Sequence, residues 1–147
     1  GIAVHRRGEV GLSAIFPYGA GWSEIAPLQF YRKFHQAIAA VFRKAGMAVE
    51  LAPAVDHAET GPCWGQPVES DLMLGGEKVC GGALRRTRRG LLYQGMFNVE
   101  VADDLAEQVA VQLGEEPSPF LIKRAWVEAA EKLVAEKYKN VEWTRRR

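Results

Sequence analysis

Three β-strand candidates follow one another in quick succession, and this crowding constrains the fold of the chain more than any other feature. They span residues 69–74, 77–85 and 91–101. Gly75-Gly76 joins the first two as a tight hairpin turn, and the segment RRTRRG (85–90) joins the second to the third. Such short connections can join only antiparallel neighbours. The pattern therefore predicts a mainly antiparallel sheet, with alternating residues on one face of the last strand: Leu91, Tyr93, Phe97, Val99 and Val101.

A long amphipathic helix is expected ahead of these strands. Pro27 lies at its start and Gly46 follows its end as a C-cap, as helix-terminal preferences favour. Residues 9–17 and Met47–Leu51 are predicted as strands on either side of the helix. The helix carries apolar side chains at three- and four-residue steps, which predicts one buried stripe: Phe30, Phe34, Ile38, Val41, Phe42 and Ala45.

Two shorter helices are expected in the last third of the chain. The first ends at Leu113, and the second runs from Pro119 to about Tyr138, with Ser118 as its N-cap. The buried face of the last helix is predicted to consist of Ile122, Trp126, Ala129 and Leu133. Strands grouped together with helices beside them predict an α+β fold, a mainly antiparallel sheet flanked by helices, in a single domain over residues 1–147.

Composition excludes several classes of protein. The net charge of +1 predicts no strong overall field and no bulk affinity for nucleic acid. No apolar run approaches the roughly 18 residues that a membrane span needs, and no signal peptide is expected at the start. Two cysteines, Cys63 and Cys80, are too few for a disulfide scaffold. Free thiols suit a reducing compartment, so the expected location is the cytoplasm. No metal site is predicted.

Three features could carry chemistry, and each has a purely structural alternative. Cys63, in a Gly/Pro-rich loop beside Trp64, could be an accessible nucleophile or an inert packing residue. Lys78 could contact the charged end of a ligand that lies across Gly81 and Gly82, because glycines inside a strand permit close approach to the backbone. A β-bulge without a ligand would explain the same glycines.

The third feature is a basic run of Arg85, Arg86, Arg88 and Arg89. It could be a solvated hairpin tip, or it could hold a phosphate or dock an acidic partner protein. No aromatic residues interleave the arginines, which argues against nucleic acid.

Three segments, in order, resemble the lipoate–protein ligase and octanoyltransferase family. GIAVHRRGEVGLS resembles the end of the family's glycine-rich segment, with Gly1 as its last glycine, His5 as its histidine, Glu9 as its acid and Ser13 as its serine. CWGQPVESDLML resembles the Cys-Phe-x-x-Pro segment of the transferase branch. GGEKVCGGALRRTRRGLLYQG resembles the family's lysine motif, which is the most specific of the three.

The resemblance implies an α+β fold related to biotin protein ligases and class II aminoacyl-tRNA synthetases. It implies that Lys78 contacts the acyl carbonyl or an activated phosphate, and that Cys63 forms an acyl thioester. Gly1, His5, Glu9, Ser13, Gly81, Gly82 and Ala83 would bind the acyl group or substrate. Cys80 competes with Cys63 as the nucleophile, because strand alternation would place it on the same sheet face as the Lys78 cation.

The chain also departs from the family pattern. The resemblance starts after the family's arginine pair and first two glycines, so we expect the N-terminal part of the family fold to be missing. A fragment, or a site completed by a second chain, would explain this.

Three functions remain open. The first is transfer of an octanoyl or lipoyl group to a lysine of a carrier-domain protein through a cysteine thioester, without a cofactor. The second is an ATP- and Mg²⁺-dependent lipoate–protein ligase. The third is a non-catalytic subunit that binds the acyl chain or the carrier.

Overall fold

The computed structural model describes residues 9–54, 66–118 and 121–140. The chain divides into two compact units, Gly1–Pro117 and Ser118–Arg147, and each is described by itself. The prediction of a single domain over residues 1–147 stays a prediction. Within the described residues, no helix is both long and apolar enough to cross a membrane.

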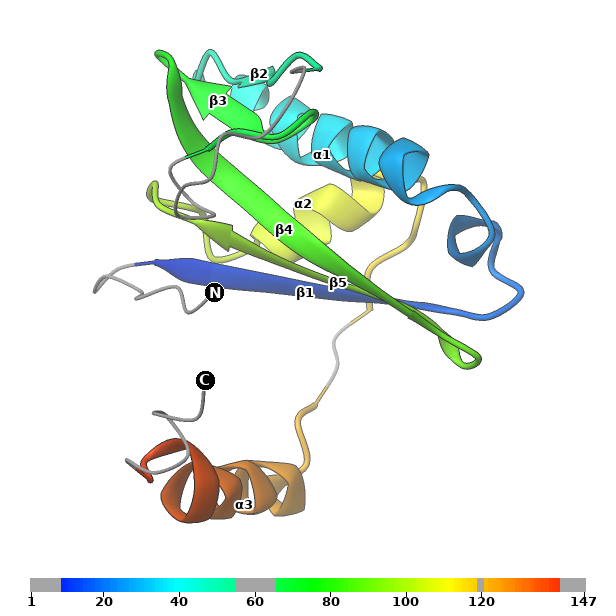
Figure 1. The fold of residues 1–147 in the computed structure, drawn as a ribbon, viewed down its shortest axis with the longest axis vertical. Coiled ribbons are helices and arrows are strands. Elements are labelled where there is room, and N and C mark those ends of the chain that lie inside the picture. The colour runs from blue at the N-terminus through cyan, green and yellow to red at the C-terminus, as the bar shows by residue number, and fades with distance from the viewer. Residues whose placement is uncertain (1–8, 55–65, 119–120, 141–147) are drawn as a thin grey trace. The chain divides into compact units, whose positions relative to one another are not determined.

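The first unit is built on a five-stranded antiparallel sheet (Figure 1). The spatial order is β1-β5-β4-β3-β2, so the first and second strands of the chain form the two edges. The strands are β1 (Val10–Pro17), β2 (Glu50–Leu51), β3 (Leu72–Leu74), β4 (Glu77–Thr87) and β5 (Gly90–Phe97). The predicted α+β class and antiparallel sheet are therefore confirmed.

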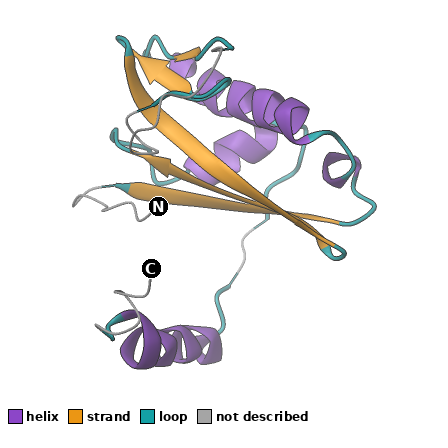
Figure 2. Ribbon diagram, in the orientation of Figure 1, coloured by secondary structure: helices purple, strands orange, loops and turns teal. Residues whose placement is uncertain are grey.

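Helices cover one face of this sheet, as Figure 2 shows. Helix α1 (Pro27–Lys44) follows a short 3-10 turn, η1 (Gly21–Ser23), and α2 (Leu105–Gln112) comes after β5. Gly46 has a positive φ of 85°, as its predicted role after the helix end requires. The predicted stripe on α1 is buried except for Ala45, and it meets the sheet in one core that includes Tyr93, Phe97 and Val109.

The strand boundaries differ from the predictions for local reasons. The strand predicted over 69–74 begins only at Leu72, because Ser70 has a positive φ of 72°, which extended strands do not adopt. The strand predicted over Met47–Leu51 is reduced to β2. The strand predicted over 91–101 ends at Phe97, so Val99 and Val101 lie beyond it.

The sequence predicts one of the two β-hairpins more accurately than the other. Gly75 and Gly76 both have positive φ, which confirms the predicted tight turn between β3 and β4. The second hairpin is longer than predicted, because Thr87 pairs with Gly90 and only Arg88-Arg89 forms its tip.

The second unit contains helix α3 (Arg124–Leu133), which continues as a π-helical turn, η2 (Val134–Tyr138). The prediction that Ser118 caps this helix is wrong, because the helix begins after Lys123. The predicted end near Tyr138 is confirmed. Within this unit α3 has no buried residue, because nothing in the unit covers Ile122, Trp126, Ala129 and Leu133, and the predicted buried face stays a prediction.

Candidate functional site

The sheet face opposite helix α1 carries several of the predicted site residues that the structure describes. Alternation along the strands turns Leu12, Tyr93 and Phe97 into the core and turns their neighbours the other way. We call the second set the open face. It consists of three cross-strand rows: Gly11, Met96 and Gly81; Ser13, Gln94 and Ala83; and Ile15, Leu92 and Arg85. Except for the buried Gly81, these residues are exposed or half-buried.

A buried ion pair lies at the Gly81 end of the open face. Lys78 Nζ lies 2.8 Å from Asp71 Oδ2, and the two side chains are only 9% and 1% exposed. Asp71 is fixed in turn, because its Oδ2 accepts the Val68 N–H at 2.8 Å. Lys78 is therefore not a solvated surface lysine. Lys78 is a cation held in one place, which is what electrostatic stabilisation of a developing charge requires.

The lysine reaches the open face because the β3–β4 pairing contains an irregularity. Leu72 pairs with Cys80 and Met73 with Lys78, so the register shifts by one residue around Val79. Val79 and Cys80 are both buried in the core. The prediction that Lys78 and Cys80 share a sheet face is therefore wrong, because the extra residue places them on opposite faces.

Gly81 leaves the space that the ion pair occupies. A Cβ at this position would stand 2.5 Å from Lys78 Cε and 2.9 Å from Asp71 Oδ1. Gly82 has a different neighbour: its Cβ would stand 2.6 Å from a ring carbon of Tyr93, on the helix side of the sheet. The two glycines predicted to approach a ligand thus accommodate the protein's own side chains. Only Gly81 faces the ion pair.

A polar network on the helix side connects α1 to the same segment. His35 Nδ1 lies 2.5 Å from the Ser70 carbonyl oxygen, so this nitrogen donates. His35 Nε2, 2.8 Å from Tyr93 Oη, then accepts from the tyrosine hydroxyl. Burial lowers the pKa of His35 and outweighs the opposing effects of Ser70 and Asp71, which fits this neutral tautomer. Since Ser70 precedes Asp71, the histidine anchors the backbone that presents the carboxylate to Lys78.

The other cysteine candidate lies inside this core. Cys80 is fully buried, and its sulfur lies 3.9 Å from Tyr93 Oη. Burial raises the pKa of the Cys80 thiol to about 12 and outweighs the opposing effects of the Tyr93 hydroxyl and the Lys78 cation. The expectation that Lys78 could activate Cys80 is therefore wrong, because Cys80 remains a thiol at neutral pH.

The remaining predicted residues are divided among several places. Gly1, His5 and Cys63 lie outside the described residues. Glu9 lies just before β1. The carbonyl of Gly82 accepts a hydrogen bond from the Tyr31 hydroxyl on the helix side. Within residues 9–54, 66–118 and 121–140, no group of three or more His, Cys, Asp or Glu residues could hold a metal ion.

Sequence reasoning missed three residues of the site: Asp71, His35 and Tyr93. Asp71 stands inside the segment CWGQPVESDLML, where the resemblance could have pointed to it. His35 is buried in the middle of α1, next to the predicted apolar stripe, where the helical pattern gives no sign of a polar contact. Its partners are 35 and 58 residues away in the sequence, and no local pattern links them.

We expect His35→Ala to lower the free energy of unfolding by about 3 kcal/mol. The substitution leaves a cavity and removes the partner of the buried Ser70 carbonyl and Tyr93 hydroxyl. Denaturant titration of both proteins measures the difference. A change below about 1 kcal/mol would contradict the assigned network.

The pH dependence of stability offers an independent check of the same histidine. Because the folded-state pKa of His35 is lowered from 6.5, the unfolded chain takes up a proton at a pH where the folded protein does not. The neutral His35 side chain therefore contributes fully to the free energy of unfolding above about pH 6.5. This contribution is lost as the pH falls below 6.5 and through the lowered pKa of the folded protein. Between about pH 7 and pH 5, we expect the free energy of unfolding to fall more in the wild-type protein than in His35→Gln. Equal losses would contradict the buried neutral imidazole.

The fold places this chain with one class of protein. Its antiparallel sheet with helices on one face is similar to solved structures of lipoate protein ligases. A Thermoplasma acidophilum structure described as a lipoate protein ligase with bound lipoic acid superimposes with a TM-score of 0.68 at 15% identity, covering 95% of this chain and 65% of that one. A lipoate-protein ligase A bound with ATP gives a TM-score of 0.68 at 16% identity, covering 95% and 66%.

A third structure is a bi-partite lipoate protein ligase with its E2 lipoyl domain from Thermoplasma acidophilum. It gives a TM-score of 0.62 at 15% identity and covers 95% of this chain and 64% of that one. The chain thus spans about 65% of the length of the solved structures it matches. No protein sequence with a curated description matches it significantly.

The family model for the lipoyl protein ligase A/B catalytic domain matches residues 1–119. The chain therefore belongs to this family, and the resemblance seen in the sequence is confirmed.

Proposed function

We propose that this chain is part of an enzyme that transfers an octanoyl or lipoyl group to a lysine of a carrier-domain protein, through a thioester on Cys63. One observation carries the proposal: the Lys78 ammonium is fixed by buried Asp71 at one end of an open sheet face. The surface next to the ion pair carries small residues on β1 and β4, Gly11, Ser13, Gly81 and Ala83, on either side of Met96 and Gln94 of β5. Such a surface leaves room for a flexible acyl chain beside a fixed positive charge.

The proposed chemistry has two steps. The Cys63 thiolate attacks the carbonyl carbon of a thioester donor, and a new C–S bond forms as the donor's C–S bond breaks and its thiolate leaves. The amine of the carrier lysine then attacks the Cys63 thioester, so an amide forms, the cysteine thiolate leaves and the amine gives up a proton. In each step negative charge develops on the carbonyl oxygen, where the Lys78 cation stabilises it.

The nature of the substrates rests on the family and its relatives. A solved relative binds lipoic acid, and another is described together with an E2 lipoyl domain. Both support a lipoyl-type acyl group and a carrier domain as the substrates here. The bi-partite organisation of the second relative also supports a second chain that completes the site.

An ATP-dependent ligase is the second candidate, favoured by the similarity to a ligase bound with ATP. In that case Lys78 would neutralise the phosphate of an acyl-adenylate, and no cysteine would take part. A non-catalytic subunit that binds the acyl chain or the carrier is the third, favoured by the similarity to a ligase described as bi-partite.

A carrier-acylation assay separates these candidates. The purified chain is incubated with an apo lipoyl domain and either an octanoylated carrier without ATP, or lipoate with ATP and Mg²⁺. We expect octanoyl transfer in the first mixture. Pyrophosphate release that depends on lipoate would favour the ligase, and acyl or carrier binding with no product in either mixture would favour the subunit.

A further inference from the structure

The β4–β5 hairpin is far more basic than the chain as a whole. From Glu77 to Phe97 it contains five cationic residues, of which Lys78 is paired with Asp71, and one acidic residue, Glu77, while the whole chain carries a net charge of only +1. Four of the five are the arginines at 85, 86, 88 and 89. A positive field is thus concentrated at this hairpin and can attract an acidic partner over about 8 Å at physiological ionic strength.

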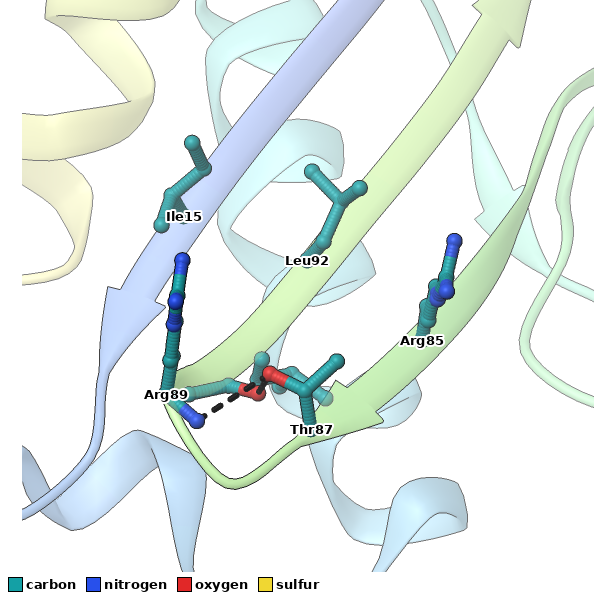
Figure 3. A pocket seen from close by; sticks show the side chains of 7 residues that line it. Ile15, Arg85, Thr87, Arg89 and Leu92 are labelled. Atoms are coloured by element: carbon teal, nitrogen blue, oxygen red, sulfur yellow. Dashed lines mark hydrogen bonds between the residues drawn. The ribbon is translucent and has the colours of Figure 1, made fainter.

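The structure divides these four arginines by role. Arg86 donates from Nη2 to the Ile25 carbonyl at 2.5 Å, so it holds the loop between η1 and α1. Arg88 lies at the turn. Arg85 and Arg89 remain, and they line a surface pocket of about 250 Å³ with an apolar floor that includes Ile15 and Leu92. Figure 3 shows Leu92 between Arg85 and Arg89.

Hydrogen bonds hold the rim of the pocket in place, and two arginines of its lining are outside the ion pairs of the described residues. Thr87 Oγ1 accepts the Arg89 N–H at 3.1 Å, and Arg89 O accepts the Tyr18 N–H at 3.1 Å, which ties the hairpin tip to the end of β1. In the described part of the chain, Arg85 and Arg89 take part in no ion pair. Two guanidinium groups beside the exposed Ile15 and the half-buried Leu92 complement a carboxylate that has an aliphatic neighbour.

We propose that the pocket between Arg85 and Arg89 is the docking point for an acidic surface of the carrier domain. The proposal deepens the proposed function and rests on it. Arg85 lies on the open face, four residues along β4 from Gly81, a separation of about 13 Å. A carrier bound at the hairpin therefore lies beside the Lys78 ion pair, within the footprint of one small domain.

The test compares two double variants with the same change in net charge. Arg85→Glu/Arg89→Glu reverses the pocket, and Arg32→Glu/Lys33→Glu reverses two exposed cations on α1. The first readout is the affinity for a purified apo lipoyl domain at low and high salt. The second is the rate at which a small octanoyl thioester acylates the protein itself, in the absence of the carrier domain. We expect the pocket variant to weaken carrier binding by about tenfold at low salt and less at high salt. The α1 variant should change binding by less than about twofold, and both should keep the small-thioester reaction.

Three outcomes would overturn the docking proposal. Binding could be unchanged in the pocket variant, it could fall equally in both variants through net charge alone, or the pocket could prefer a single-stranded oligonucleotide to the lipoyl domain. Failure of the proposed function is recognised separately. In that case the wild-type chain transfers no acyl group, yet the binding comparison still decides the docking point.

Discussion

Replacing Lys78 and Asp71 together by Met and Asn is expected to lower the rate of acyl transfer by about 100-fold while the protein remains folded. A fixed cation next to a developing oxyanion contributes on this scale to the reaction rate. Methionine keeps most of the lysine's apolar volume beside Gly81. The asparagine retains an oxygen that can accept the Val68 N–H, which holds Asp71 in place. The measurement is the turnover of octanoyl transfer to an apo lipoyl domain.

The double variant is needed because a single substitution of Lys78 would combine a loss of catalysis with a loss of stability. Lys78→Ala would leave the Asp71 carboxylate, 1% exposed, without its cation. Breaking a buried ion pair in this way typically costs about 3 to 5 kcal/mol of stability, so lost activity could reflect unfolding. Removing both charges avoids the stranded carboxylate.

Asp71→Asn alone is the matched control. It keeps the Lys78 ammonium but leaves it without its carboxylate, so it too breaks the buried ion pair and is compared only where it is folded. In the folded protein we expect a smaller loss of turnover than in the double variant. Circular dichroism and thermal unfolding establish that both variants are folded. Turnover within about threefold of wild type in a folded double variant would remove Lys78 from the mechanism.

The sequence predicts the parts of this fold that depend on local patterns. The Gly75-Gly76 turn and the apolar stripe of α1 from Phe30 to Phe42 follow from conformational preference and periodicity, and both are confirmed. Periodicity also predicts the last helix, but no residue of its own unit covers its apolar stripe through Trp126. An amphipathic pattern reports that a helix has an apolar face, and it does not report what that face contacts.

The candidate site was predictable only in part, because its geometry depends on one inserted residue. The motif around Lys78 identifies the lysine, but strand alternation would put Cys80 beside it. The register shift at Val79 reverses that arrangement. Ser70, with its positive φ, and the distant His35 then fix Asp71 against the lysine. Neither a bulge nor a contact across 35 residues leaves a periodic signal in the sequence.

This geometry sharpens the choice between the two cysteines. Cys80 is buried on the helix side, opposite the Lys78 ion pair, and its thiol has a pKa raised to about 12. At neutral pH it offers almost no thiolate to attack an acyl group. Cys63 lies outside the described residues, and its role rests on the Cys-aromatic-x-x-Pro segment of the transferase branch. Exclusion of Cys80 leaves Cys63 as the remaining thiol of the chain.

Cys63→Ser is therefore expected to abolish the covalent octanoyl adduct, while Cys80→Ser leaves the yield of adduct unchanged. The protein is incubated with an octanoylated carrier, quenched in acid and digested, and the thioester is located by mass spectrometry. Serine is a matched change at both positions, and transfer to the apo lipoyl domain should be lost only with the first variant. An adduct on Cys80 alone would overturn the assignment. If neither cysteine is acylated and the carrier lysine is modified only when ATP is supplied, the protein is a ligase instead.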